Sequence, residues 1–229
     1  MHYMQIQTIN SEIISCRKCP RLVEWREKVA QEKRKAYRDH EYWGKPVPGF
    51  GDSAARVFVV GLAPGAHGSN RTGRQFTGDA SGNFLYPALH RAGFANRPDS
   101  TSRDDGLILT DMYIAASARC APPDNKPTPE ELSTCLPYLK TELQLIQPKV
   151  LVALGKIAFD TILRITSTRP TALKFSHAAV FSLPPSNFIP HNSYLICSYH
   201  PSQQNTLTGK LTVEMFDTIW QQARTLIHQ

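Results

Sequence analysis

The sequence predicts an α/β protein in which helices cover both faces of a mainly parallel sheet. Short apolar runs alternate with longer segments of helical periodicity along the chain. This alternation is typical of parallel strands joined by helical crossovers. The 229 residues suffice for one sizeable core, and no linker or low-complexity tract divides them. We therefore expect one domain over residues 1–229.

Four strands are predicted, at residues 56–61, 107–117, 149–154 and 194–199. Each contains a short apolar run, as expected of strands buried on both faces. Pro-, Ser- and Gly-bearing loops are expected at residues 45–55 and 166–192, inside the same domain.

Helices are predicted at residues 81–93, 128–147, 155–165 and 210–228, from apolar positions at helical spacing. The second has the strongest start signal, because Thr128 precedes a proline and Glu131 stands three residues later. That spacing predicts a capping box with Thr128 as N-cap.

Composition excludes some classes of protein. No run of about 18 apolar residues is present, so we expect no membrane span and no membrane partner. Residues 1–10 lack the basic and apolar blocks of a signal peptide. We therefore expect a reducing, cytoplasmic location, where clustered cysteines bind metal more often than they form disulfides.

The formal charge of +7 is unevenly distributed. Residues 17–38 hold nine Lys or Arg and three Glu, a net of +6, and the remainder has a net of +1. One interpretation is a solvated helix face. The other is a patch that neutralises the phosphates of nucleic acid.

Four of the five cysteines form two pairs about a hundred residues apart. Cys16 and Cys19 form a C-x2-C step, and Cys120 and Cys135 form a C-x14-C step. Four thiolates could hold a soft cation or an iron–sulfur cluster, and zinc fits the spacing as well. Such a site would be structural, since no coordination position stays open. Four unrelated buried thiols are the alternative, and the fifth cysteine is predicted as a buried strand residue.

Two loops follow predicted strands and are candidates for a binding site. Residues 61–68 (GLAPGAHG) follow the first strand, and residues 200–202 (HPS) follow the fourth. Ligands bind beyond the carboxyl ends of the strands in an open parallel sheet. We therefore expect these loops to meet at one cleft. The glycine-rich loop alone is a weak signal, because it matches neither phosphate-binding pattern.

Three segments closely resemble the family-5 uracil-DNA glycosylases: GLAPGAHGSNRTGRQFTGDASG (61–82), ARCAPPDNKPTPEE (118–131) and SYHPSQQNT (198–206). The resemblance covers essentially the whole chain. It implies the three-layer α/β/α sandwich of that superfamily around a four-stranded, mainly parallel sheet, and a [4Fe–4S] cluster. It also implies excision of uracil and other deaminated or damaged bases from DNA. We expect the protein to be a monomer.

The resemblance carries site residues onto matching positions. The cluster ligands become Cys16, Cys19, Cys120 and Cys135. The catalytic group becomes Asp79, Asn125 and His200. The base- and DNA-binding group becomes Gly61, Ala63, Pro64, Gly65, His67, Phe76, Ser202, Gln203 and Asn205, with Phe76 expected to stack on the extruded base.

Ala63 departs from most of the superfamily, where a polar residue near this position can place water. A methyl group cannot do so, and the departure agrees with the family-5 pattern. Our hypothesis is that Asp79 orients water or supports the developing sugar cation. The alternative is that Asp79 or Ser81 only caps the following helix. For Asn125 the alternative to a functional role is that of a turn residue. For His67 the alternative is that of a residue that only stabilises the loop.

His200 is expected to donate a hydrogen bond to the base as it leaves, which a neutral imidazole can do. No motif position supplies a lysine for a Schiff base, so we expect a monofunctional glycosylase that leaves an abasic site. Two alternatives remain at this point: a glycosylase-like module that binds DNA without catalysis, for which Ala63 is the best support, and a zinc-stapled nucleotide-binding protein.

Overall fold

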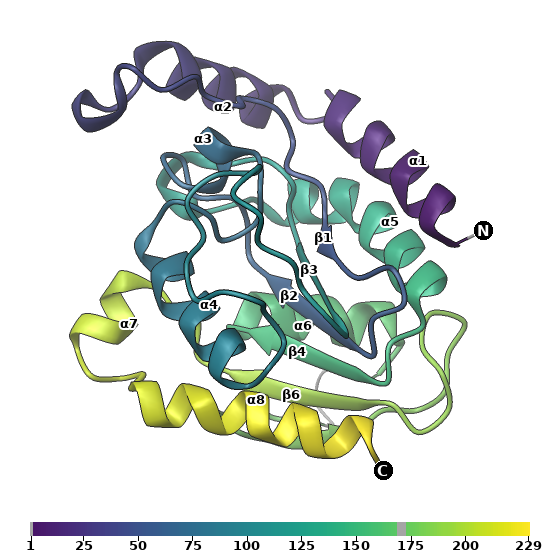
Figure 1. Ribbon diagram of the computed structural model, residues 1–229. Coiled ribbons are helices and arrows are strands. Elements are labelled where there is room, and N and C mark those ends of the chain that lie inside the picture. The colour runs from purple at the N-terminus through teal and green to yellow at the C-terminus, as the bar shows by residue number, and fades with distance from the viewer. Residues whose placement is uncertain (1, 169–172) are drawn as a thin grey trace.

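The computed structural model describes residues 2–168 and 173–229 (Figure 1). Residues 169–172, inside the expected loop 166–192, lie outside the described part. The helices are α1 (His2–Ser15), α2 (Pro20–Glu32), α3 (Ser69–Thr72), α4 (Ala80–Arg91), α5 (Pro129–Ile146), α6 (Lys156–Ile165), α7 (Gln203–Leu207) and α8 (Val213–Ile227). The strands are β1 (Phe50–Gly51), β2 (Val57–Gly61), β3 (Met112–Ala116), β4 (Val150–Leu154), β5 (Val180–Ser182) and β6 (Tyr194–Ser198).

One sheet of the order β1-β3-β2-β4-β6-β5 forms the middle layer. The four inner strands β3, β2, β4 and β6 pair in parallel, and β1 and β5 add to the two edges in antiparallel orientation. The predicted α/β class is confirmed, while the predicted number of four strands is wrong in its detail. The edge strands have two and three residues, too few to show a period in the sequence, and both lie in segments expected as loops.

Helices cover both faces of the sheet, as the resemblance implies for a three-layer sandwich. Alternate residues of β2 divide between two cores: Phe58 and Val60 pack with α1, α5 and α6, whereas Val57 and Val59 pack with α4 and α8. All residues of β2, β3 and β4 are buried. The strands therefore show continuous apolar runs and not an alternation, because each face is covered.

The local signals of the α5 segment are confirmed at atomic level. The Glu131 backbone N–H donates to Thr128 Oγ1 at 3.2 Å, and the Glu131 carboxylate accepts from the Thr128 N–H at 2.8 Å. This capping box starts α5, whose second turn carries Cys135. Within residues 2–168 and 173–229, no helix has both the length and the apolar character needed to cross a membrane.

Candidate active site

The two predicted motif loops meet at the carboxyl edge of the sheet. β2 ends at Gly61 and β6 at Ser198, and parallel pairing through β4 puts both ends on one side. The rings of Phe76 and His200 lie 5.9 Å apart between centroids and are tilted by 34°. A Cβ added to Gly61 would lie 2.8 Å from Phe76 Cζ, so this ring packs directly on the end of β2. The expected meeting of distant segments is thus confirmed.

His200 is half-buried, and burial lowers the pKa of its imidazole to about 4. The ring is therefore neutral at neutral pH and carries one N–H donor. The His200 carbonyl accepts a hydrogen bond from Asn205 Nδ2 at 2.9 Å. Ser202 caps α7 by accepting from the Asn205 N–H at 3.4 Å. Ser202 and Asn205 thus hold the loop that carries His200, and Gln203 is exposed beside them.

Phe76 occupies a backbone conformation that side chains rarely adopt, with φ of 50°. Its carbonyl oxygen approaches α4 closely, because a Cβ on Gly82 would stand 1.8 Å from it. Only 8% of the Phe76 residue is exposed, so little of the ring faces solvent. A strained backbone conformation, such as the positive φ of Phe76, persists only where surrounding contacts hold it.

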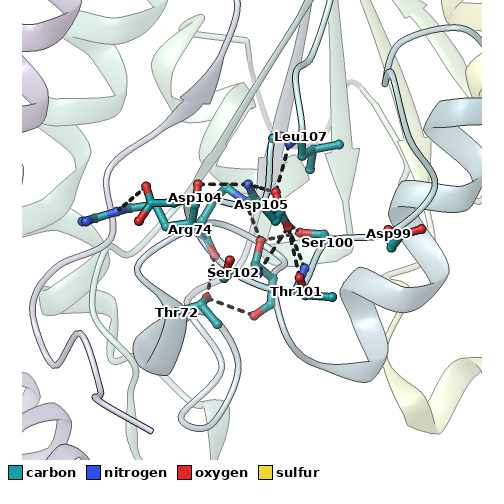
Figure 2. A network of polar contacts seen from close by, with 12 residues as sticks. Thr72, Arg74, Asp99, Ser100, Thr101, Ser102, Asp104, Asp105 and Leu107 are labelled. Atoms are coloured by element: carbon teal, nitrogen blue, oxygen red, sulfur yellow. Dashed lines mark hydrogen bonds and ion pairs between the residues drawn. The ribbon is translucent and has the colours of Figure 1, made fainter.

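A buried polar network supplies those contacts (Figure 2). Arg74 forms a bidentate pair with Asp105, at 2.8 Å from Nη1 to Oδ1 and 2.6 Å from Nη2 to Oδ2. The same guanidinium donates to Thr77 Oγ1 at 2.9 Å and to Ser100 Oγ at 2.8 Å. Both members of the ion pair are nearly inaccessible, at 2% and 6% exposure.

The network fixes the chain on both sides of Phe76. Thr77 and Ser100 share a hydrogen bond of 2.7 Å between hydroxyls, and Tyr86 Oη donates to the Gln75 carbonyl at 2.7 Å. Although burial opposes ionisation, hydrogen bonds from Arg74 and from backbone amides keep the pKa of Asp105 well below its usual range. Sequence reasoning missed this support. The sequence offers one sign of it: Arg74 directly precedes Gln75 and Phe76 in the segment 61–82.

Asp79 has the capping role that the sequence offered as one alternative, while its catalytic role stays a prediction. It is the N-cap of α4, with Oδ1 accepting from the Gly82 N–H at 3.0 Å. Oδ2 faces the glycine-rich loop, since a Cβ on Gly68 would lie 1.9 Å from it and one on Gly65 3.0 Å from it. Burial raises the pKa of Asp79, against backbone hydrogen bonds and the charge of Arg71.

The remaining predicted residues differ in setting. Ala63 is half-buried and Pro64 buried in the loop. His67 Nδ1 lies 3.1 Å from Tyr42 Oη, and the pKa of His67 is lowered by burial and by nearby arginine charges. Asn125 is exposed in a turn with φ of 56°, and its side chain makes no hydrogen bond within the described residues. Its backbone thus follows the turn interpretation, while its catalytic role stays a prediction.

The four paired cysteines line one cavity between the N-terminal helices and α5, together with Arg119 and Tyr138: Cys16, Cys19, Cys120 and Cys135. All four are free thiols. Arg26 Nη1 donates to Cys120 Sγ at 3.0 Å, and the Arg119 N–H donates to Cys135 Sγ at 3.3 Å. In the described part of the chain, no group of three or more His, Cys, Asp or Glu is arranged to hold a metal ion.

The four thiols that line this cavity are a donor set that fits a cation. Burial raises the pKa of Cys120 to about 11 and that of Cys135 to about 12. Four thiolates side by side would therefore require compensating positive charge, which bound metal supplies when it displaces the thiol protons. The N–H···S contacts resemble those that tune sulfur ligands of iron–sulfur clusters. The donor set thus fits a cluster.

Comparison with known sequences places the chain in a family. A model of the uracil DNA glycosylase superfamily matches residues 48–224, well over half of the chain. The chain belongs to this superfamily. It is 52% identical over 215 residues to the type-5 uracil-DNA glycosylase of Thermus thermophilus, covering 93% of this chain and 94% of that protein.

Two further relatives of the superfamily carry the same name. The type-5 uracil-DNA glycosylase of Mycobacterium leprae is 48% identical over 224 residues, which cover 96% of this chain and 95% of that protein. That of Pyrobaculum aerophilum is 44% identical over 213 residues, which cover 93% of this chain and 89% of that protein. The resemblance drawn from the motifs thus extends over most of the chain.

The Arg74–Asp105 pair generates a stability prediction. Asp105→Asn leaves a buried guanidinium without its counter-charge, so the free energy of unfolding should fall by about 3–5 kcal/mol in urea titrations. Because the pair lowers the carboxyl pKa, its contribution is complete above the unfolded value of roughly 3.9 and is lost as the pH falls below it.

The matched control for that measurement is Asp99→Asn. Asp99 pairs with Arg97 at the surface and is 52% exposed in its side chain. Its removal should cost less than about 1 kcal/mol. Equal, small losses in both variants would contradict the supporting role of the buried pair.

Proposed function

We propose that the protein is a monofunctional DNA glycosylase that hydrolyses the N-glycosidic bond of uracil and other deaminated or damaged bases in DNA. The observation that carries the proposal is the convergence of His200, Phe76, Asp79 and the glycine-rich loop at one edge of the sheet. The type-5 uracil-DNA glycosylases to which the chain is similar support the choice of substrate. The product is an abasic site in base excision repair.

The reaction begins with extrusion of the base, because the glycosidic bond cannot be reached inside a duplex. Extrusion costs a few kcal/mol, and stacking on Phe76 offsets roughly 1–3 kcal/mol of it. Leu207, which is 76% exposed at the end of α7, is an apolar side chain available to fill the gap in the duplex.

His200 stabilises the base as it leaves. The sugar becomes cationic and the base leaves as an anion, so a donor at the base carbonyl lowers the barrier. A neutral imidazole donates without the cost of a buried positive charge, which agrees with its lowered pKa. The ring contact with Phe76 holds the imidazole beside the surface on which the base stacks.

Water activation falls to Asp79 in this proposal. Ala63 offers only a methyl group, whereas Asp79 Oδ2 lies against the same glycine-rich loop. Because Oδ1 is held by the cap of α4, the second oxygen has a fixed direction. A carboxylate there can orient the attacking water or stabilise the cationic sugar.

We further propose that the four cysteines hold a [4Fe–4S] cluster and not a single zinc ion. The support is that four thiols line one cavity, that two of them accept N–H hydrogen bonds at sulfur, and that the motifs resemble a family for which a cluster is expected. The cluster would act as a structural staple and take no part in the hydrolysis.

The other expectations follow from this function. Four reduced thiols and a DNA substrate agree with the cytoplasm as the location. DNA is the proposed partner, and a monomer suffices because the site is built by one chain. The absence of a polar side chain at Ala63 favours a broad substrate range, including hydroxymethyluracil and hypoxanthine.

The proposal is tested with a duplex oligonucleotide that contains one uracil opposite guanine. The wild-type protein should generate alkali-labile breaks at that uracil, and His200→Ala should lower the single-turnover rate constant roughly 10²–10³-fold. His191→Ala is the control, because His191 is exposed near the amino end of β6. A wild-type protein that binds this duplex and leaves the uracil in place would establish the non-catalytic module instead.

A pH profile of the same rate constant separates the two titratable groups. His200 stays neutral until the pH approaches about 4, so no step is expected near the ordinary histidine value of roughly 6.5. Burial raises the pKa of Asp79, so loss of its charge should contribute to the acid limb of the profile. The rate should thus be level at neutral and alkaline pH, and Asp79→Asn should lower the plateau and displace the acid limb to lower pH. An unchanged plateau would remove Asp79 from the mechanism.

Iron analysis tests the cluster. The wild-type protein should be coloured and contain iron and sulfide in equal amounts, and Cys120→Ser should lose both. Cys197→Ala is the matched control, since Cys197 is a buried thiol of β6 in the core of the sheet. It should retain full colour. Stoichiometric zinc in a colourless wild-type protein would contradict the proposal.

A further inference from the structure

The basic run at residues 17–38 divides into two parts with different partners. The basic residues of its first part that form ion pairs are Arg17 with Glu27, Arg21 with Glu131, Arg26 with Glu27, and Lys28 with Glu32. Arg26 also donates a hydrogen bond to the thiol of Cys120 in the cysteine cavity. Most of this charge is therefore neutralised within the protein.

The second part is different. Lys33, Arg34, Lys35 and Arg38 make no ion pair within residues 2–168 and 173–229. We name residues 33–38 the basic strap. It places four positive charges in six consecutive positions without an acidic residue. The last three of these basic side chains are exposed, and Lys33 is half-buried with its Nζ donating to the Arg38 carbonyl at 3.1 Å.

The basic strap is attached to the glycine-rich loop by a short chain of contacts. The Arg34 N–H donates to Tyr42 Oη at 3.3 Å, and this hydroxyl lies 3.1 Å from His67 Nδ1. Tyr42 is buried at that junction. The charge of Arg34 lies near enough to His67 to contribute to lowering the pKa of that imidazole.

Arg71 in α3 forms a second attachment. Its guanidinium lies over the ring of Tyr37, 4.0 Å from the centroid, and its Nη1 is 3.1 Å from His40 Nδ1. The same guanidinium donates to the carbonyls of His67 and Gly78, each at 2.8 Å. One buried arginine thus ties the basic strap to the residues on both sides of the candidate active site. Figure 1 shows α2, which precedes the strap, beside α3.

We propose that the basic strap binds the phosphates of the DNA strand next to the extruded nucleotide. This deepens the proposed function and rests on it. Exposed cations without a protein partner can exchange condensed counterions for phosphates, which supplies salt-dependent affinity. Attachment through Tyr42 and Arg71 fixes these charges beside the loop that faces the base. The exposed acids Asp39 and Glu41 follow directly and limit the contact to residues 33–38.

The test is a triple variant, Arg34→Gln, Lys35→Gln and Arg38→Gln, measured by fluorescence anisotropy with a uracil-containing duplex over a series of salt concentrations. The slope of log affinity against log salt is negative. Its magnitude should decrease by about 0.9 for each residue that faces a phosphate, and so by up to roughly 2.7. In excision assays KM should rise, whereas the single-turnover rate constant at saturating enzyme should stay within about twofold, because no reacting group changes.

The control removes the same charge elsewhere: Lys140→Gln, Lys149→Gln and Arg164→Gln. These residues make no ion pair in the described part of the chain. Lys149 directly precedes β4, at the opposite edge of the sheet, and Lys140 lies over the ring of Phe188 in the loop before β6. Their removal should leave the salt slope nearly unchanged.

The outcomes separate this inference from the proposed function. Equal slopes for the strap and control variants would overturn the strap inference, whether or not uracil is excised. A lowered slope in a protein that excises no base would retain the strap as a DNA-binding element and overturn the glycosylase assignment. The single variants Arg34→Gln and Arg38→Gln, each expected to lower the slope by about 0.9, decide the matter if the triple variant does not fold.

Discussion

Parallel pairing of β2, β4 and β6 is the constraint on which the candidate site depends. Strands that run in one direction end at one edge, so loops from residues 61 and 198 onward emerge together although they are far apart in the chain. The contact between Phe76 and His200 follows from that edge. All residues of β2 and β4 are buried, so packing on both faces holds these strands in place.

Rigid support around Phe76 is achieved by polar atoms placed inside the protein. The Arg74–Asp105 pair holds the chain before and after this residue, and Gly82 leaves room for its carbonyl. Buried ion pairs of this kind are weak stabilisers compared with apolar packing, but they define one arrangement. In this protein the arrangement defined is that of the aromatic ring at the end of β2.

The N-terminal third brings two groups of functional residues to this edge, the first cysteine pair and the basic strap. Its cysteines line a cavity with residues from the middle of the chain, and its basic strap is attached to the glycine-rich loop through Tyr42 and Arg71. Within the same run of sequence, the arginines near the cavity are paired or contact sulfur. Among the described residues of this run, the cations without an ion pair are Lys18 and the four that follow α2. A count of charges along the chain cannot separate these groups.

The sequence alone determined the α/β class, the four inner strands and the capping box of α5, because each depends on neighbours within a few residues. It also indicated the motif residues. Only the tertiary structure decided the edge strands β1 and β5, which are too short to carry a period. It alone paired Arg74 with Asp105 across 31 positions and directed one oxygen of Asp79 toward Gly68. Such contacts join segments that are distant in the chain, and no local pattern of residues encodes which of the many polar side chains will meet.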